Sequence, residues 1–180
     1  MIHRVVTLGG PPGSGKSTAG RLVAETLDLE YRSAGEIFRA EGARRGMTVE
    51  AFGAFAATHP EVDRELDRRM QALAAPGRLL EGRIQGALCR RAGTPVYSVV
   101  VTAEEAERAR RVAGRDGQTV DAAREALRER ERVERARYLA YYGIDLATEP
   151  ADLTVDSTRI PAAAVADAIV GFLARSEARA

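Results

Sequence analysis

One segment constrains the fold of this chain more than any other. Residues 10–17, Gly-Pro-Pro-Gly-Ser-Gly-Lys-Ser, match the pattern G-x-x-x-x-G-K-[ST] at every fixed position. An apolar, β-branched run at 2–8 lies directly before them, and apolar residues at helical spacing follow over 18–27. In such a strand, turn and helix, glycines let backbone N–H groups point at phosphate oxygens, and the helix adds its positive N-terminal end. The segment therefore predicts a phosphate-binding loop, which we favour over a ligand-free glycine turn.

Composition sharpens the role of Lys16 within this loop. Of the 27 basic residues, 26 are arginines and only Lys16 is a lysine. A GC-rich coding sequence explains the bias, and a lysine that survives it marks a position that arginine cannot fill. A compact ammonium that reaches the β and γ phosphates of a nucleotide is such a position, and the Ser17 hydroxyl is suited to Mg²⁺. The residues expected to hold the nucleotide are Gly10, Pro11, Pro12, Gly13, Ser14, Gly15, Lys16, Ser17 and Thr18.

The rest of the chain alternates between strands and helices. Apolar runs predict strands over 2–8 and 96–101, and short strands are expected over 31–33, 79–81 and 153–155. Helices are expected over 18–27, after Ser33 as an N-cap with Glu36 completing a capping box, and over 48–57, 60–73, 104–114, 120–142 and 162–173. This alternation predicts an α/β fold over residues 1–180 as one domain, with a parallel sheet covered by helices on both faces.

Charge and cysteine usage exclude several classes of protein. The net charge of +1 argues against a nucleic-acid polymer as partner, and no apolar run is long enough to span a membrane. The single cysteine, Cys89, excludes an internal disulfide and fits a reducing cytoplasm. We therefore expect a cytoplasmic protein that acts on small molecules, as a monomer.

The asparagine and arginine content also separates the classes of protein that carry a phosphate-binding loop. The chain contains no asparagine, so it lacks the Asn-Lys-x-Asp pattern by which GTPases read guanine. A kinase that phosphorylates a hydroxyl needs a carboxylate base. A phosphate acceptor is already ionised, because the second pKa of a phosphate group is about 6. A phosphate acceptor instead needs positive charge. The abundance of arginine therefore favours transfer of a phosphoryl group to a phosphate.

Arginines concentrate in one pair of expected helices. From Glu104 to Arg137 the sequence holds ten arginines and nine acidic residues, most of which suit a solvated helical face. Two sets each share one face of a helix: Arg108, Arg111 and Arg115, and Arg130, Glu134 and Arg137. Joined at 115–118, the two helices predict a hinged lid over 104–137 that closes over phosphates and excludes water.

Several further segments carry a resemblance when read in order. They are Gly-Gly-Pro-Pro-Gly-Ser-Gly-Lys-Ser-Thr at 9–18, Ser-Ala-Gly-Glu-Ile-Phe-Arg at 33–39, Gly-Met-Thr-Val-Glu-Ala-Phe-Gly at 46–53, Asp-Arg-Glu-Leu-Asp-Arg-Arg at 63–69, Leu-Glu-Gly-Arg at 80–83 and Tyr-Tyr-Gly-Ile-Asp at 141–145. With the arginine faces described above, the chain resembles the short, archaeal-type cytidylate kinases of the nucleoside monophosphate kinase group. The resemblance extends from Gly9 to about Ser157.

This resemblance implies a P-loop kinase fold with a five-stranded parallel sheet, and ATP-dependent phosphorylation of CMP and dCMP with Mg²⁺. It implies an acceptor-nucleotide segment over 33–75. By matching position, the residues implied on the acceptor nucleotide are Ser33, Arg39, Arg83, Arg130 and Arg137, with Glu134 on its ribose. Lys16, Arg130 and Arg137 would act on the transferring phosphoryl group together with Arg111 and Arg115 from the lid. Glu81 would either hold Mg²⁺ through water or anchor Arg83, two roles left equally open.

Two questions remain open in the sequence. The carboxylates that suit the exocyclic amine of cytosine are Asp63 and Asp67, beside the possible donors Arg64 and Arg68. The basic segment 89–94 departs from the family pattern, which leaves a modified cytidine nucleotide as a possible substrate. Two other functions stay as alternatives, a kinase of small hydroxyl compounds with Asp63 as base and an ATP-binding regulatory module.

Overall fold

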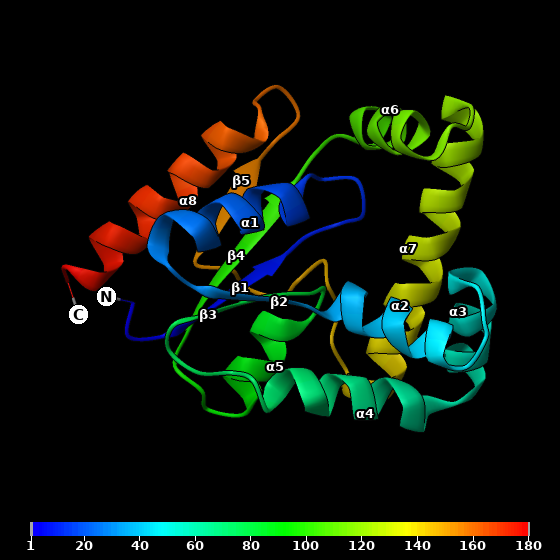
Figure 1. The fold of residues 1–180 in the computed structure, drawn as a ribbon, viewed down its shortest axis with the longest axis horizontal. Helices are drawn as coiled ribbons and strands as arrows, with labels where there is room; N and C mark the ends of the chain where they lie inside the picture. Colours follow the sequence, from blue (N-terminus) through cyan, green and yellow to red (C-terminus); the bar gives the residue numbers. More distant parts are fainter. Residues whose placement is uncertain (1, 180) are drawn as a thin grey trace.

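The computed structural model describes residues 2–179 and has a five-stranded parallel sheet at its centre (Figure 1). The strand order is β2-β3-β1-β4-β5, and all four neighbouring pairs are parallel. The strands are β1 (Val5–Gly9), β2 (Glu30–Ser33), β3 (Arg78–Glu81), β4 (Val96–Thr102) and β5 (Leu153–Asp156). The predicted sheet is confirmed, and the carboxyl ends of its strands gather the loops that form the site.

The first strand begins later than its apolar sequence predicts. Residues 2–4 lie outside β1, and the pairing with β4 starts at Val5 opposite Val96. Pro95, directly before β4, has no N–H to extend a ladder in that direction, although its carbonyl accepts from Val5 N at 3.2 Å. The expected start at residue 2 is therefore wrong by three residues because the neighbouring strand ends the pairing.

Helices cover both faces of the sheet. α1 (Lys16–Leu27) and α8 (Ala162–Glu177) pack side by side on one face, and α5 (Gln85–Arg91) packs on β1 and β4 from the other. α4 (Pro60–Gln71) contacts α5, and α2 (Ala34–Arg44) packs on α4, β2 and β3. The remaining helices are α3 (Val49–Thr58), which packs on α2 and α4, and the hairpin of α6 (Glu105–Asp116) and α7 (Val120–Tyr142). In Figure 1 this hairpin stands beyond the end of β4 that carries α6.

The core forms around the inner strands β1 and β4, whose residues are mostly apolar. Val6, Leu8 and Val99 of the inner strands are buried against Val23 of α1 and Ile169 of α8. Both faces of a parallel sheet are covered, so its strands read as continuous apolar runs. The α6–α7 hairpin has a separate small core of Ala109, Val112, Ala113, Ala123 and Leu127. The two helices of this hairpin therefore pack on each other through apolar contacts separate from the core of the sheet.

The short helix α5 was not expected from the sequence. A Cβ on Gly86 would lie 2.3 Å from Ser98 Oγ, so this glycine lets α5 lie directly on the sheet. At its end, Arg91 donates to the carbonyls of Tyr142 and Gly143, the last of these at 3.1 Å, and so caps the C-terminus of α7. Arg90 likewise pairs with Asp152 at 3.1 Å. The basic segment 89–94 is thus structural, and it no longer supports a modified nucleotide as substrate.

The predicted capping box is half formed. Ser33 Oγ accepts from Glu36 N at 3.4 Å, as an N-cap does. The Glu36 carboxylate pairs with Arg21 of α1 instead of returning to the Ser33 backbone.

Within residues 2–179, no helix is both long and apolar enough to cross a bilayer.

Candidate active site

The phosphate loop, residues 10–17, connects β1 to α1 in the predicted place. Gly10 has φ 131°, and a Cβ there would lie 2.0 Å from the Val101 carbonyl oxygen. Gly13 has φ 80°, and its Cβ would lie 2.9 Å from the Arg108 carbonyl oxygen. Both positions need glycine because the loop turns in the left-handed region against β4 and α6. The loop is therefore held in shape by its neighbours.

Lys16 projects from the loop into a charged environment. Its Nζ lies 3.6 Å from Glu81 Oε1 and 3.5 Å from the Pro11 carbonyl oxygen. Burial lowers the pKa of Lys16, Glu81 opposes this shift, and the positive charges of Arg83 and Arg130 add to it. The Lys16 amine thus shares one electrostatic site with arginines that come from β3–α5 and from α7.

Glu81 ends β3 beside Lys16. Its Oε2 accepts hydrogen bonds from the Tyr31 hydroxyl at 2.7 Å and from Ser33 Oγ at 2.8 Å. Burial raises the pKa of Glu81, but Lys16 and the hydrogen bonds, including one from Ser17, outweigh it and leave the pKa below its usual value. Among the described residues, Arg83 pairs with Glu134 and not with Glu81, so the predicted anchoring of Arg83 by Glu81 is wrong. The chain folds β3 so that Glu81 faces the loop while Arg83 turns toward α7.

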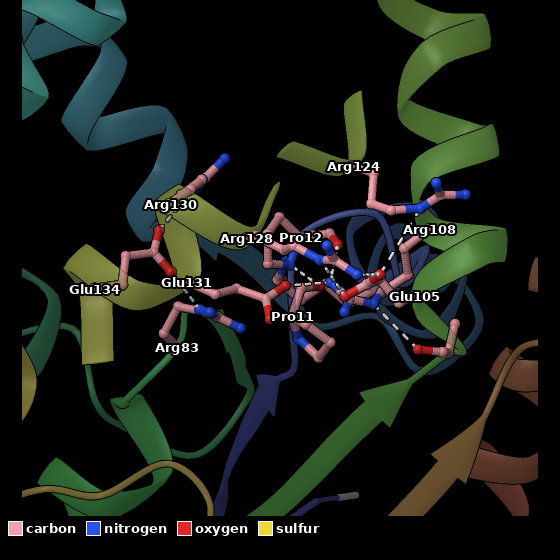
Figure 2. A network of polar contacts seen from close by, with 12 residues as sticks. Pro11, Pro12, Arg83, Glu105, Arg108, Arg124, Arg128, Arg130, Glu131 and Glu134 are labelled. Atoms are coloured by element: carbon pink, nitrogen blue, oxygen red, sulfur yellow. Dashed lines mark hydrogen bonds and ion pairs between the residues drawn. The ribbon is translucent and has the colours of Figure 1, made fainter. Parts of the chain in front are cut away.

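Glu134 of α7 holds two arginines at once. Arg83 Nε donates to Glu134 Oε2 and Arg130 Nε to Oε1, each at 2.7 Å (Figure 2). Burial raises the pKa of Glu134, and the two guanidinium groups outweigh that effect and lower it. Each carboxylate oxygen can accept a further hydrogen bond, so the implied contact of Glu134 with a ribose stays a prediction.

Asp63 and Arg137 form a second buried pair, between α4 and α7. Asp63 Oδ2 and Arg137 Nε are 2.9 Å apart, yet the N–H does not point along the line between them. Neither atom has a hydrogen-bond partner among the described residues. Burial raises the pKa of Asp63 to about 6, with Arg137 opposing and Asp67 and Glu134 adding to the rise. Buried polar atoms are normally bonded, so these two atoms retain unused hydrogen-bonding capacity.

The other expected base readers divide into two kinds. Asp67 is partly buried, and it accepts from the Tyr142 hydroxyl at 2.7 Å and from Gln85 Nε2 at 3.3 Å. Arg64 and Arg68 lie on the exposed side of α4, where Arg64 stacks over the Tyr141 ring. The structure therefore brings the two carboxylates to the inner side of α4 and leaves both arginines outside.

The arginines expected in the lid and on the acceptor take different positions. Arg111 donates to Ser157 Oγ at 3.0 Å and to the Ser157 carbonyl at 2.7 Å, close to the phosphate loop. Arg115 is 69% exposed and pairs with Asp116. Arg39 is exposed on α2, with its guanidinium beside Gly35. Arg115 and Arg39 are therefore not gathered with the buried arginines in this structure.

A cavity of about 520 Å³ opens beside the phosphate loop. Its walls are the loop and the start of α1, the first turns of α6, and the connection from β5 to α8. Ser157 ties these walls together, because its Oγ donates to the Ser14 carbonyl at 2.7 Å. The residues that this site adds to the predicted set are Glu107, Arg110, Ser157, Thr158, Arg159, Ile160 and Pro161. The only sequence signal for 157–161 was the end of a predicted strand, which falls at this edge of the sheet.

Comparison with known proteins agrees with this geometry. Residues 9–128 match the AAA domain family. A cytidylate kinase from Archaeoglobus fulgidus is 36% identical over 168 residues, covering 92% of each chain. A cytidylate kinase from Methanocorpusculum labreanum is 37% identical over 178 residues, covering 96% of this chain and 99% of that one. The chain belongs to the cytidylate kinase family. The resemblance seen in the sequence is thereby confirmed, and the chain is an enzyme of the nucleoside monophosphate kinase type.

Solved structures place this cytidylate kinase family member among other phosphate-loop kinases. Shikimate kinase from Acinetobacter baumannii, in complex with shikimate, superimposes with a TM-score of 0.63 at 19% identity, covering 97% of this chain and 94% of that one. A gluconokinase from Sinorhizobium meliloti 1021 gives a TM-score of 0.52 at 17% identity, covering 97% and 93%. At these identities the likeness concerns the fold alone. It confirms the predicted P-loop kinase fold.

Proposed function

We propose that this protein transfers the γ-phosphoryl group of MgATP to CMP, and also to dCMP, forming ADP and the nucleoside diphosphate. The observation that carries the proposal is the charged site between the phosphate loop and α7. Lys16 stands on the donor side, and Arg83 and Arg130, bridged by Glu134, stand on the acceptor side. Phosphoryl transfer between two phosphates needs alignment and neutralised charge more than covalent chemistry.

The donor side suits MgATP. Backbone N–H groups of the loop and Lys16 would hold the phosphates, and the cavity at Ser157 would take the nucleoside. The Ser17 hydroxyl and the ionised Glu81 carboxylate offer oxygen donors beside the loop. Mg²⁺ commonly takes one or two protein oxygens, with phosphates and waters supplying the rest.

The acceptor side suits a nucleoside monophosphate. Its phosphate would be held by Arg39, Arg83, Arg130 and Arg137, three of which lie near one another in the structure. A phosphate acceptor needs these positive charges, whereas a hydroxyl kinase would need a carboxylate base in their place. The acceptor-segment and lid assignments, 33–75 and 104–137, belong to this proposal.

Asp63 is the better candidate to read the cytosine amine. Its Oδ2 is buried without a hydrogen-bond partner among the described residues, whereas Asp67 is already satisfied by Tyr142 and Gln85. A site that accepts from an exocyclic amine leaves polar groups unpaired when uracil binds, which costs about 1–3 kcal/mol.

We propose that all these groups act within one chain, as a monomer. A cytoplasmic location is proposed from the unpaired thiol of Cys89.

The test is acceptor-dependent formation of ADP by the purified protein with MgATP. CMP is compared with cytidine, which has the same base but offers a 5′-hydroxyl in place of the phosphate, and with no acceptor. We expect ADP and CDP with CMP and no turnover above background with cytidine. Turnover with cytidine alone would indicate a hydroxyl kinase. Binding of ATP with no ADP from either compound would indicate a regulatory module.

A further inference from the structure

Arg108 joins three separate segments at the base of the site. It lies in the first turns of α6, and its side chain is 8% exposed. Its Nε donates to the Ala103 carbonyl at 3.1 Å, and its Nη1 donates to the Pro12 carbonyl at 3.3 Å. The same Nη1 pairs with the Glu131 carboxylate of α7 (Figure 2). One guanidinium thus connects the phosphate loop, the β4–α6 connection and α7.

The α6–α7 hairpin does not require this link for its own packing. It has an apolar core, and a second ion pair joins the same two helices, Arg128 with Glu105 at 2.8 Å. Among the described residues, the hydrogen bonds and ion pairs of Arg128 and Glu105 stay within α6 and α7 and do not include the phosphate loop. Burying a guanidinium is costly unless its donors are satisfied. The contact of Arg108 with the Pro12 carbonyl therefore distinguishes the Arg108–Glu131 pair from the Arg128–Glu105 pair.

We propose that Arg108 and Glu131 form a positioning pair for phosphoryl transfer, which sets the separation between the phosphate loop and the acceptor arginines of α7. Glu131 directly follows Arg130 and precedes Glu134 by three residues, so fixing Glu131 fixes that turn of α7. Arg130 and Glu134 both act electrostatically on Lys16 across the site. Neither Arg108 nor Glu131 needs to touch a nucleotide. This inference rests on the proposed function.

The pair has a distinct kinetic consequence. Each nucleotide keeps its own contacts when the pair is broken. The phosphate loop persists, and so do the hydrogen bonds from Arg83 and Arg130 to Glu134. Only the alignment of donor and acceptor is lost, and a misplacement of about 1 Å can lower a rate about 100-fold. The pair should therefore affect kcat more than the KM of either substrate.

The test compares Glu131→Gln with the matched control Glu105→Gln. Both substitutions remove a carboxylate that bridges α6 and α7 to an arginine 23 residues away in sequence. We expect Glu131→Gln to lower kcat at least about tenfold, with the KM for ATP and for CMP changed by less than about threefold. Glu105→Gln should change kcat less than about twofold. Glu131 is 32% exposed, so the substitution is compatible with folding.

Amide hydrogen exchange of the two variants tests the Arg108–Glu131 pair without measuring turnover. Glu131→Gln should increase amide exchange in the phosphate loop as well as in α7, whereas Glu105→Gln should affect only the two helices. Equal kcat in the two variants, or unchanged exchange of the loop in Glu131→Gln, would overturn the inference. If the wild-type protein does not phosphorylate CMP, the proposed function fails, and exchange alone then decides the positioning pair.

Discussion

At the scale of single residues, the site depends on one ammonium group. Lys16 is the only lysine among 27 basic residues, and its Nζ fits between Glu81 and the Pro11 carbonyl. Lys16→Ala should lower kcat by about 10³ or more, as expected when a preorganised charge at the transition state is lost. Lys16→Arg should also be severely impaired, because a planar guanidinium cannot occupy the same narrow space.

The measurement is steady-state kcat for both variants, with thermal unfolding as the check on folding. Both proteins should unfold near the wild-type temperature, since the substitutions leave the sheet and its core intact. Turnover close to that of wild type in Lys16→Arg would remove the argument that this lysine is selected for its shape.

Asp63 predicts how stability depends on pH. Its pKa is about 6 in the folded protein against 3.8 in a free side chain, so the folded state holds the proton more tightly. This group's contribution to stability is therefore complete below about pH 4 and is lost as the pH rises through about 6. Asp63→Asn removes the titration. The Tm of this variant relative to wild type should rise between about pH 4.5 and pH 6.5 and then level off.

Asp145 supplies the control for this measurement. Its pKa is lowered by hydrogen bonds from the Ala147 backbone and the Arg135 side chain, so it is ionised throughout that pH range. The Tm of Asp145→Asn relative to wild type should then stay constant over the same range. Parallel curves for the two variants would show that Asp63 does not titrate near pH 6.

At the scale of elements, α7 carries arginines with different environments. Arg137 is buried beside Asp63, and Arg130 pairs with Glu134. Arg132 is 70% exposed and pairs with Glu129 of the same helix. Arg130→Ala or Arg137→Ala should lower kcat/KM for CMP at least about 100-fold, as loss of a charge on a transferring phosphate does. Arg132→Ala should change it less than about twofold.

Arg132 is a better control than other arginines of α7. Arg124 and Arg128 both reach Glu105 of α6, so replacing either would also disturb the hairpin. The three alanine variants come from one helix, so helix propensity affects them alike. If all three retain similar kcat/KM, the arginines of α7 form only a solvated charged face.

The elements themselves were largely predictable, for a physical reason. Strands buried on both faces need continuous apolar runs, and these occur in the inner strands β1 and β4, whereas the edge strand β2, Glu-Tyr-Arg-Ser, has none. The helix α5 was missed because it is short and its fit depends on Gly86 approaching Ser98, a contact that no local pattern encodes. The start of β1 was missed for a similar reason, since its neighbour β4 ends the pairing.

At the scale of the whole molecule, the phosphate loop was predictable and the partners of its arginines were not. The loop is contiguous in sequence, so its spacing is enough to identify it. The bond from Arg83 to Glu134 joins residues 51 positions apart, and the Asp63–Arg137 pair joins α4 to α7. Such partners are set by the topology, which brings distant helices to one edge of the sheet. For the same reason the hydrogen bonds from Arg83 and Arg130 to Glu134 were not predicted from the sequence.

The central claim is that this protein is a kinase for cytidine monophosphates. The measurement that tests it most directly is kcat/KM for CMP, dCMP, UMP, AMP and GMP at saturating MgATP. CMP should exceed UMP at least about tenfold, because reversing one buried polar contact costs about 1–3 kcal/mol. AMP and GMP should be worse still because a purine is too large. The value for dCMP should remain within about tenfold of that for CMP, because Glu134 is the only proposed ribose reader and one lost hydrogen bond costs about 1 kcal/mol. Equal or better turnover of UMP or AMP would contradict the account.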